Sequence, residues 1–238
     1  MNGKLVLFGE TFNEIENWPR GLKIVVFIYD FVSKEWRRGA DMSTGRIFFA
    51  CAVSSSKGLI YVAGGQDEHG NSLATAEAYD VEEDRWEVLP PMTQDHTSAV
   101  GVYLEGKFIV ITEGSTKAFH EETGSWNTLE NMWIFPTSIT VECYFVCTRG
   151  TLYLILSKEV MEYDAQKNVW TPVTSVPVVI TLVFCAAAWR DQIFVNGLTE
   201  EGNPISYFFQ PSTGKWSEVE HQEFAPYSPA YVVTSLEI

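Results

Sequence analysis

Short apolar segments alternate with polar turns along the chain, and the clearest example lies within residues 47–92. Apolar stretches at 48–53 and 59–63 are separated by the segment Ser-Ser-Ser-Lys-Gly. A third stretch ends at Tyr79-Asp80, and a fourth covers 86–89 before two prolines. Short apolar segments bounded by Gly, Pro and Ser are typical of β-strands joined by tight turns. This part of the chain is therefore predicted to form four antiparallel strands.

The same pattern recurs five times, and tryptophans that lie 40 to 50 residues apart mark the repeats. An aromatic residue stands seven positions before each of these tryptophans. The five pairs are Tyr29 and Trp36, Tyr79 and Trp86, Phe119 and Trp126, Tyr163 and Trp170, and Phe209 and Trp216. Four short antiparallel strands in each such period are the signature of a β-propeller blade. The predicted fold class is an all-β propeller of five recognisable four-stranded blades.

The repeat frame also predicts the organisation of the chain as a single domain, 1–238. The first repeat contains three expected strands, so a C-terminal strand is expected to complete that blade and close the ring. A propeller of six blades stays open as an alternative if further residues precede Met1. The expected repeats are approximately 1–46, 47–96, 97–136, 137–176 and 177–222, followed by the closing strand 231–238.

The second repeat carries a recognisable set of motif residues. Its second strand ends in Gly64-Gly65, a Tyr-Asp pair follows at 79–80, and Trp86 comes at a fixed distance. This combination resembles the kelch motif. Later copies are degenerate, since the fourth has Ser157-Lys158 in place of the glycines. The chain is most similar to the kelch portion of plant F-box/kelch-repeat proteins, and the resemblance is carried by residues 26–42, 60–71 and 86–92.

Composition fits a folded chain and restricts the classes of partner. Hydrophobic residues make up 46%, and 16 basic against 31 acidic residues give a formal charge of −15. A phosphate backbone binds concentrated positive charge, so nucleic acid and anionic membranes are disfavoured, whereas basic proteins are favoured. The longest mostly apolar stretch, Val176 to Trp189, is shorter than the about 20 residues of a membrane-spanning helix. No targeting segment is recognisable, and the expected location is the cytoplasm, the nucleus or both.

Patterns that would indicate catalysis or metal binding are weak. The four cysteines lack the Cys-x2-Cys spacing of zinc sites and are expected to be buried free thiols. His69 and His96 are expected on one face, but no third ligand stands at a suitable spacing. No phosphate-binding glycine loop or Gly-x-Ser-x-Gly motif is present. We therefore predict no enzymatic activity, no cofactor and no metal site. A kelch-type enzyme, such as a sugar-acid epimerase or a specifier-like protein, and a stand-alone scaffold are the alternatives.

The predicted protein-binding residues lie in loops that connect second to third strands and one blade to the next. Trp18 and Trp133 stand outside the tryptophan frame, so packing between blades does not account for them. Exposed tryptophan and arginine side chains are enriched in interface hot spots. The predicted set is Trp18, Arg20, Arg46, Asp67, His69, Asp95, His96, Trp133, Phe135, Glu200 and Glu201.

The resemblance implies a role in ubiquitination. In the F-box/kelch family the propeller selects a target protein, and an N-terminal F-box docks it on a Skp–cullin ubiquitin ligase, which leads to degradation by the proteasome. Targets of similar plant members include phenylalanine ammonia-lyase and cytokinin-response regulators. Because Lys4 is already expected to begin a blade strand, this chain is expected to bind a target without an F-box of its own.

Overall fold

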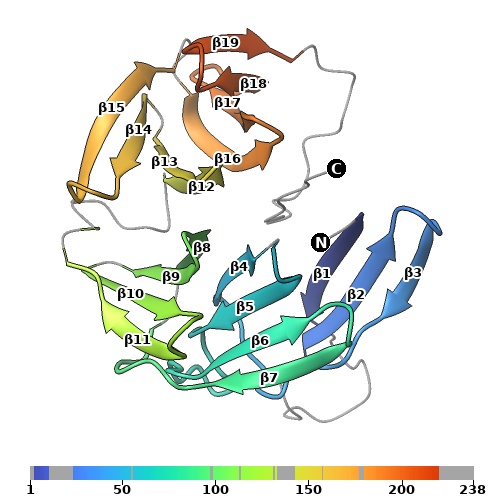
Figure 1. Ribbon diagram of the computed structural model, residues 1–238. Coiled ribbons are helices and arrows are strands. Elements are labelled where there is room, and N and C mark those ends of the chain that lie inside the picture. The colour runs from blue at the N-terminus through green and yellow to red at the C-terminus, as the bar shows by residue number, and fades with distance from the viewer. Residues whose placement is uncertain are drawn as a thin grey trace. The chain divides into compact units, whose positions relative to one another are not determined.

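The computed structural model describes the chain in nine stretches, and all of its regular elements are β-strands (Figure 1). The described residues are 3–10, 24–54, 56–96, 99–112, 114–130, 132, 143–156, 158–176 and 180–219. Among them, no helix has the length and apolar character that crossing a membrane requires.

The strands form five antiparallel sheets, which we name blades 1 to 5 in chain order. This confirms the predicted all-β class and the five blades of the propeller repeat. Blade 1 contains β1 (Lys4–Glu10), β2 (Ile24–Asp30) and β3 (Glu35–Arg38). Blade 2 contains β4 (Ala50–Ser54), β5 (Leu59–Ala63), β6 (Ala76–Asp80) and β7 (Arg85–Leu89). Blade 3 contains β8 (Val100–Leu104), β9 (Lys107–Thr112), β10 (Ser115–His120) and β11 (Ser125–Thr128).

The last two blades complete the described strands. Blade 4 contains β12 (Tyr144–Thr148), β13 (Thr151–Ile155), β14 (Glu159–Asp164) and β15 (Val169–Ser175). Blade 5 contains β16 (Ile180–Trp189), β17 (Gln192–Thr199), β18 (Pro204–Gln210) and β19 (Lys215–Glu218). The chain divides into two compact units, of which unit 1 holds blades 1 to 3 and unit 2 holds blades 4 and 5.

The paired aromatic residues of the repeat frame face each other across one hairpin in every blade. In blade 2, Tyr79 of β6 is the register partner of Trp86 of β7, and their ring centroids lie 4.8 Å apart. Such cross-strand aromatic pairs each stabilise a sheet by about 0.5–1.5 kcal/mol. The other centroid distances are 5.0 Å for Tyr29 and Trp36, 5.4 Å for Phe119 and Trp126, 5.1 Å for Tyr163 and Trp170, and 4.8 Å for Phe209 and Trp216.

The spacing of seven residues follows from the turn that joins these two strands. Asp80 accepts hydrogen bonds at its Oδ1 from the backbone N–H groups of Glu82 and Glu83, both at 3.0 Å, and so fixes the start of the turn. The last turn residue has a positive φ angle, which favours Gly, Asn and Asp. These residues are Lys34, Asp84, Gly124, Asn168 and Gly214, with φ angles of 59°, 52°, 62°, 54° and 65°.

Tryptophan indoles join neighbouring blades within unit 1. The Nε1–H group of Trp86 donates a hydrogen bond of 2.9 Å to the carbonyl oxygen of Ala40 in the chain leaving blade 1. The Nε1–H group of Trp126 donates one of 2.7 Å to the carbonyl oxygen of Pro90, which follows blade 2. Both acceptors stand four residues after the framed tryptophan of the preceding blade. These two tryptophans therefore link consecutive blades of this unit.

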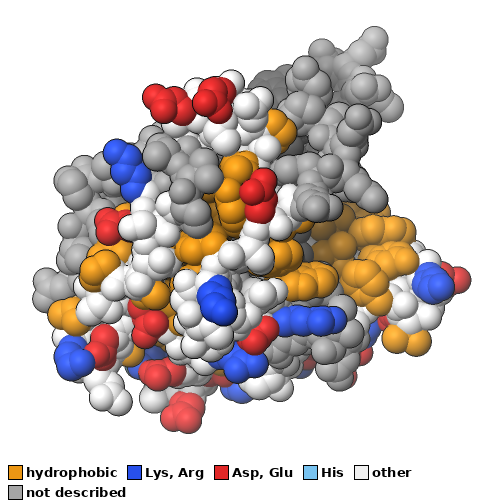
Figure 2. Space-filling view, turned by 90° about the horizontal axis from the view of Figure 1, so that it is seen from above, with side chains coloured by type: hydrophobic (Ala, Val, Ile, Leu, Met, Phe, Trp, Pro, Cys, Tyr) orange, Lys and Arg blue, Asp and Glu red, His pale blue; other side chains and the backbone are white. Residues whose placement is uncertain are grey.

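The described part of blade 1 has three strands, and β1 lies at its edge. Val26 and Ile28 are buried and pack toward blade 2, whereas Phe27 on the opposite face is 42% exposed. Hydrophobic side chains gather at the right of Figure 2, the side on which Figure 1 draws blade 1. The predicted closing strand 231–238 lies outside the described residues, so ring closure stays a prediction.

Unit 2 has an apolar core of its own between blades 4 and 5. Ile155 and Val160 of blade 4 and Ile193 and Phe209 of blade 5 are fully buried members of this core. The Tyr144 hydroxyl also donates a hydrogen bond of 2.8 Å to the carbonyl oxygen of Val183, between the first strands of the two blades. The two blades are therefore held together by both apolar packing and hydrogen bonds.

Candidate functional site

Three loop segments meet at one end of blade 2, and we call residues 43–49, 64–75 and 92–96 the blade-2 loop cluster. Ile47 and Gln66 exchange two backbone hydrogen bonds of 3.0 and 2.9 Å. The N–H group of Gly65 donates to the carbonyl oxygen of His96 at 2.7 Å, and the N–H group of His96 donates to that of Leu73 at 3.1 Å. These bonds bring five of the predicted site residues into one cluster: Arg46, Asp67, His69, Asp95 and His96.

Gly65 allows the three segments to approach so closely. Its φ angle is +89°, and an added Cβ atom would lie 2.4 Å from the carbonyl oxygen of Ile47 and 3.0 Å from the Cβ atom of Phe49. No other residue type fits both the backbone conformation and this space. The Gly-Gly sequence of the motif is therefore a packing requirement of the loop cluster.

The prediction that Arg46 is an exposed contact residue is wrong. Its side chain is completely buried, and Nη1 donates hydrogen bonds of 2.9 Å to the carbonyl oxygens of Gly64 and Thr75. Nη2 donates to Oε1 of Glu77, which is also buried, at 2.8 Å. The planar guanidinium suits this role because it can satisfy several carbonyl and carboxylate acceptors at once. Arg46 therefore holds the loops together from inside, and the sequence alone did not distinguish this from a surface role.

Glu77 is the centre of this buried network. Its carboxylate accepts hydrogen bonds from the Ser43 N–H and hydroxyl groups at 3.0 and 2.5 Å and from the Thr44 N–H group at 3.2 Å. Burial lowers the pKa of Arg46, and the hydrogen bond to Glu77 opposes that effect. Arg46 Nε is buried without a hydrogen-bond partner among the described residues, and breaking a buried charge pair of this kind is strongly destabilising.

Asp67 orders the loop between β5 and β6. Its carboxylate accepts hydrogen bonds from the backbone N–H groups of His69 and Asn71, both at 2.8 Å, and from the Asn71 side-chain amide at 2.9 Å. These hydrogen bonds hold the pKa of Asp67 below its usual value, and the bond from the Asn71 side-chain amide has the largest effect. The exposed His69 ring lies 3.5 Å from the Glu68 carboxylate. This loop thus presents ordered acidic groups to the solvent.

His96 occupies a different environment from His69. Its Nε2 atom is buried and has no hydrogen-bond partner among the described residues. Burial, followed by the charge of Lys117, lowers the pKa of His96. The neighbouring Asp95 is exposed. Although the two histidines belong to the same loop cluster, no metal-binding group of three or more His, Cys, Asp and Glu side chains exists in the described part of the chain.

The remaining predicted residues do not join this cluster. Glu200 and Glu201 are exposed in the turn between β17 and β18 of unit 2. Trp18, Arg20, Trp133 and Phe135 lie outside the described residues, so their role stays a prediction.

The structure adds Phe48 to the candidate site residues. The sequence pattern predicts that this residue lies inside a strand. Phe48 precedes β4, its φ angle is 54°, and 63% of its surface is exposed. The Ile47–Gln66 hydrogen bonds hold the chain on one side, and the Phe49 ring packs edge-on against Phe8 on the other, with centroids 6.1 Å apart. A bulky residue with positive φ is rare and costs free energy. The run of apolar residues resembled an ordinary strand, so no pattern in the sequence indicated this exposed aromatic.

All four cysteines are free thiols, as predicted, but only Cys143 is buried, whereas Cys51, Cys147 and Cys185 are half-buried. Burial raises the pKa of Cys51 to about 12 and those of Cys143 and Cys147 to about 11. Since the thiolate is the nucleophile, a raised pKa lowers the reactivity of these three thiols.

Comparison with known proteins points to the same motif. The family model of the Kelch motif matches residues 48–93, which cover blade 2. The chain is a kelch-repeat protein related to F-box/kelch-repeat proteins. F-box/kelch-repeat protein SKIP20 of Arabidopsis thaliana is 40% identical over 155 residues, which are 56% of this chain and 35% of the relative. A second F-box/kelch-repeat protein of that plant is 31% identical over 209 residues, or 82% of this chain and 57% of the relative.

These relatives indicate the kind of module that the chain forms, and their lengths show how much of a relative the chain matches. The motif match and the relatives imply a protein-interaction module, which agrees with the predicted role in protein recognition. The match covers about a third of the length of two curated relatives and just over half of the length of another.

Proposed function

We propose that this kelch-repeat protein binds a target protein through the blade-2 loop cluster, with Phe48 as the apolar anchor of the contact. The observation that carries the proposal is an aromatic side chain that is 63% exposed while its backbone is held at a positive φ angle. Strained residues of this kind persist where the surrounding structure fixes them, and they gather at binding sites. A central aromatic residue surrounded by polar groups is the usual composition of an interface hot spot.

The charge of the cluster suggests the kind of target. Asp67, Glu68 and Asp95 belong to the same loops as Phe48, and the whole chain has a formal charge of −15. Acidic groups steer basic partners toward a site and disfavour acidic ones. We therefore expect the target surface to combine an apolar patch with lysine or arginine side chains.

The relatives suggest a consequence of target binding. Because they are named F-box/kelch-repeat proteins, we propose that the chain supplies target recognition to a Skp–cullin ubiquitin ligase in the cytoplasm or nucleus. The free cysteines fit a reducing compartment. Phenylalanine ammonia-lyase and cytokinin-response regulators are the first defined targets to test.

The test places a photocrosslinking amino acid, p-benzoylphenylalanine, at Phe48 and, as a control, at Val88, which is 70% exposed on β7. Each purified candidate target is then mixed with both proteins and irradiated. We expect crosslinks from position 48 and none above background from position 88. Equal crosslinking at the two positions would contradict the proposed site.

A binding measurement sharpens the same test. Phe48→Asn removes the ring but retains a residue that tolerates positive φ. We expect its affinity for a crosslinked target to fall by about tenfold or more, as for a hot-spot residue. The melting temperature should not fall, and Val88→Asn should leave affinity unchanged. Unchanged affinity of Phe48→Asn would remove Phe48 from the interface.

A further inference from the structure

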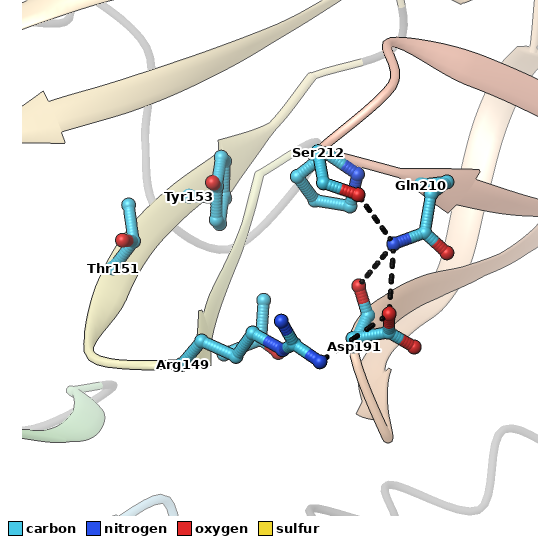
Figure 3. A pocket seen from close by; sticks show the side chains of 8 residues that line it. Arg149, Thr151, Tyr153, Asp191, Gln210 and Ser212 are labelled. Carbon is cyan, nitrogen blue, oxygen red and sulfur yellow. Dashed lines mark hydrogen bonds and ion pairs between the residues drawn. The ribbon is translucent and has the colours of Figure 1, made fainter.

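Hairpin tips of blades 4 and 5 enclose a pocket of about 190 Å³ in unit 2 (Figure 3). It lies at the end of these blades where β12 turns into β13, β16 into β17 and β18 into β19. The loops equivalent to the blade-2 loop cluster leave the strands at their other end. The pocket is lined by Thr148, Arg149, Thr151, Tyr153, Asp191, Gln210, Pro211 and Ser212.

Arg149 is the main charged group that the pocket offers to a ligand. Its side chain is 73% exposed, and its ion pair with Asp191 is a loose contact of 3.5 Å between Nη2 and Oδ2. The guanidinium fork can form two parallel hydrogen bonds with a carboxylate, so this single contact leaves most of its donors unused. The presence of Asp191 also shows that a carboxylate fits beside this fork, as Figure 3 illustrates.

Gln210 holds the other wall in place. Its Nε2 group donates to Oδ2 of Asp191 at 3.0 Å, to the carbonyl oxygen of Asp191 at 3.2 Å and to Oγ of Ser212 at 3.0 Å. Ser212 also lines the pocket, where its hydroxyl group can donate a hydrogen bond to a ligand. Gln210 therefore holds the Asp191 carboxylate and the Ser212 hydroxyl group in place through hydrogen bonds that do not involve Arg149.

A second arginine stands at the equivalent hairpin tip of blade 5. Arg149 and Arg190 both have positive φ angles, 50° and 57°, and both are exposed. The Thr148 hydroxyl donates a hydrogen bond of 3.1 Å to the carbonyl oxygen of Arg190, which holds the two tips together. Two exposed arginines thus stand on neighbouring hairpin tips in a protein with a formal charge of −15.

We propose that this pocket binds the carboxylate of an aspartate or glutamate side chain of a partner protein. Arg149 forms the paired hydrogen bonds and Ser212 donates a third. Asp191 in the wall repels any anion while Arg149 attracts any anion, so inorganic phosphate is included in the test as the competing ligand. The site is independent of the blade-2 loop cluster and accepts the opposite charge.

The test uses the 238-residue chain, labelled with 15N, and two small-molecule probes. Both probes have blocked, uncharged backbone termini and differ only in their side chain. N-acetylglutamate N-methylamide carries the carboxylate, and N-acetylglutamine N-methylamide is its neutral counterpart. NMR spectra record the Nε–Hε signal of Arg149 and the amide signal of Gly150 during titration. We expect a saturable shift with the glutamate probe and at least about tenfold weaker binding of the glutamine probe, since the charged hydrogen bonds are lost. Inorganic phosphate at equal concentration should shift these signals less.

Matched variants separate a site from a general charge effect. Arg149→Asn removes the cation at a position where Asn tolerates the positive φ angle, and we expect it to abolish the saturable shift of Gly150. Lys34→Asn removes an exposed cation with a φ angle of 59° in blade 1 and should change nothing. If Arg149→Asn fails to fold, Arg149→Lys retains the charge without the fork, and binding should weaken several-fold. Equal affinity for both probes, no saturable shift with either probe, tightest binding of phosphate, saturable binding by Arg149→Asn, or undiminished affinity of Arg149→Lys would overturn the proposal.

Discussion

Blades 2 and 3 share one hairpin frame but fill the same buried positions with different charges. Arg46 and His96 each follow a framed tryptophan by ten residues, and Glu77 and Lys117 each precede a framed aromatic by two. In blade 2 these positions form a buried ion pair of 2.8 Å. In blade 3 they hold a histidine and a buried lysine, and the positive charge of Lys117 lowers the pKa of His96.

The consequence appears in the hydrogen bonds. Lys117 Nζ donates to Oγ1 of Thr128 at 2.9 Å, while His96 Nε2 and the buried Thr116 hydroxyl have no partner within the described stretches. Blade 3 therefore keeps the strands and the aromatic pair without the charged network that ties the blade-2 loops. The kelch family model matches residues 48–93, which include the strands, the aromatic pair and Glu77 of blade 2 but not Arg46. Backbone frame and loop network are thus separable properties of a repeat.

The largest expected effect comes from breaking the pair in blade 2. Glu77→Gln leaves the buried guanidinium of Arg46 without its counter-charge, and we expect the free energy of unfolding to fall by about 3–5 kcal/mol. Urea denaturation measures this free energy of unfolding. The matched change in blade 3 is Lys117→Met, which removes a charge that is bonded to a hydroxyl rather than to a carboxylate, and its cost should be under about 1 kcal/mol. Equal costs for the two variants would mean that the pair contributes nothing special to blade 2.

A second comparison concerns the glycine that stands two residues after the second strand in blades 2 and 3. Gly65→Ala places a Cβ atom 2.4 Å from the Ile47 carbonyl oxygen, whereas a Cβ atom at Gly114 meets nothing within 4 Å. Both have positive φ angles, so each alanine costs about 1–2 kcal/mol from the backbone alone. We expect Gly65→Ala to cost about 2 kcal/mol more than Gly114→Ala through its clash. Thermal unfolding of the two variants measures this difference. Similar melting temperatures would show that the blade-2 loops can move to accommodate the added Cβ atom at little cost.

The ion pair can also be transplanted into blade 3. His96→Arg with Lys117→Glu reproduces the blade-2 residues, and we expect a favourable coupling energy of about 1–3 kcal/mol in a double-mutant cycle. Each single variant should be less stable than the double variant because each leaves a buried charge unpaired or repelled. A coupling energy near zero would show that the loops of blade 3 cannot adopt the geometry of blade 2.

The blades could be predicted from sequence because their signals are local. The distance between Tyr79 and Trp86 reflects one hairpin, and the apolar segment 59–63 coincides with β5. The candidate site was harder to predict because side-chain direction depends on contacts between distant segments. Arg46 points inward because it pairs with Glu77 there, while Phe48 points outward because the Ile47–Gln66 bridge turns the chain. A single sequence shows neither partner.

The histidine of blade 3 gives the smallest expected effect, a dependence of stability on pH. Burial and Lys117 lower the pKa of His96 in the folded state, while Asp95 opposes them weakly. The unfolded chain, with a histidine pKa of about 6.5, therefore takes up the proton first as the pH falls. Stability is fully present above that pH and is lost as the pH falls through the folded-state pKa. His96→Gln should reduce this loss as the pH falls below the unfolded-state pKa of about 6.5, whereas the same change at the exposed His69 should not. Since blade 2 has an arginine in place of His96, this titration distinguishes the two blades. If the parent and both variants show the same dependence of stability on pH, His96 is not the group that causes the loss of stability at low pH.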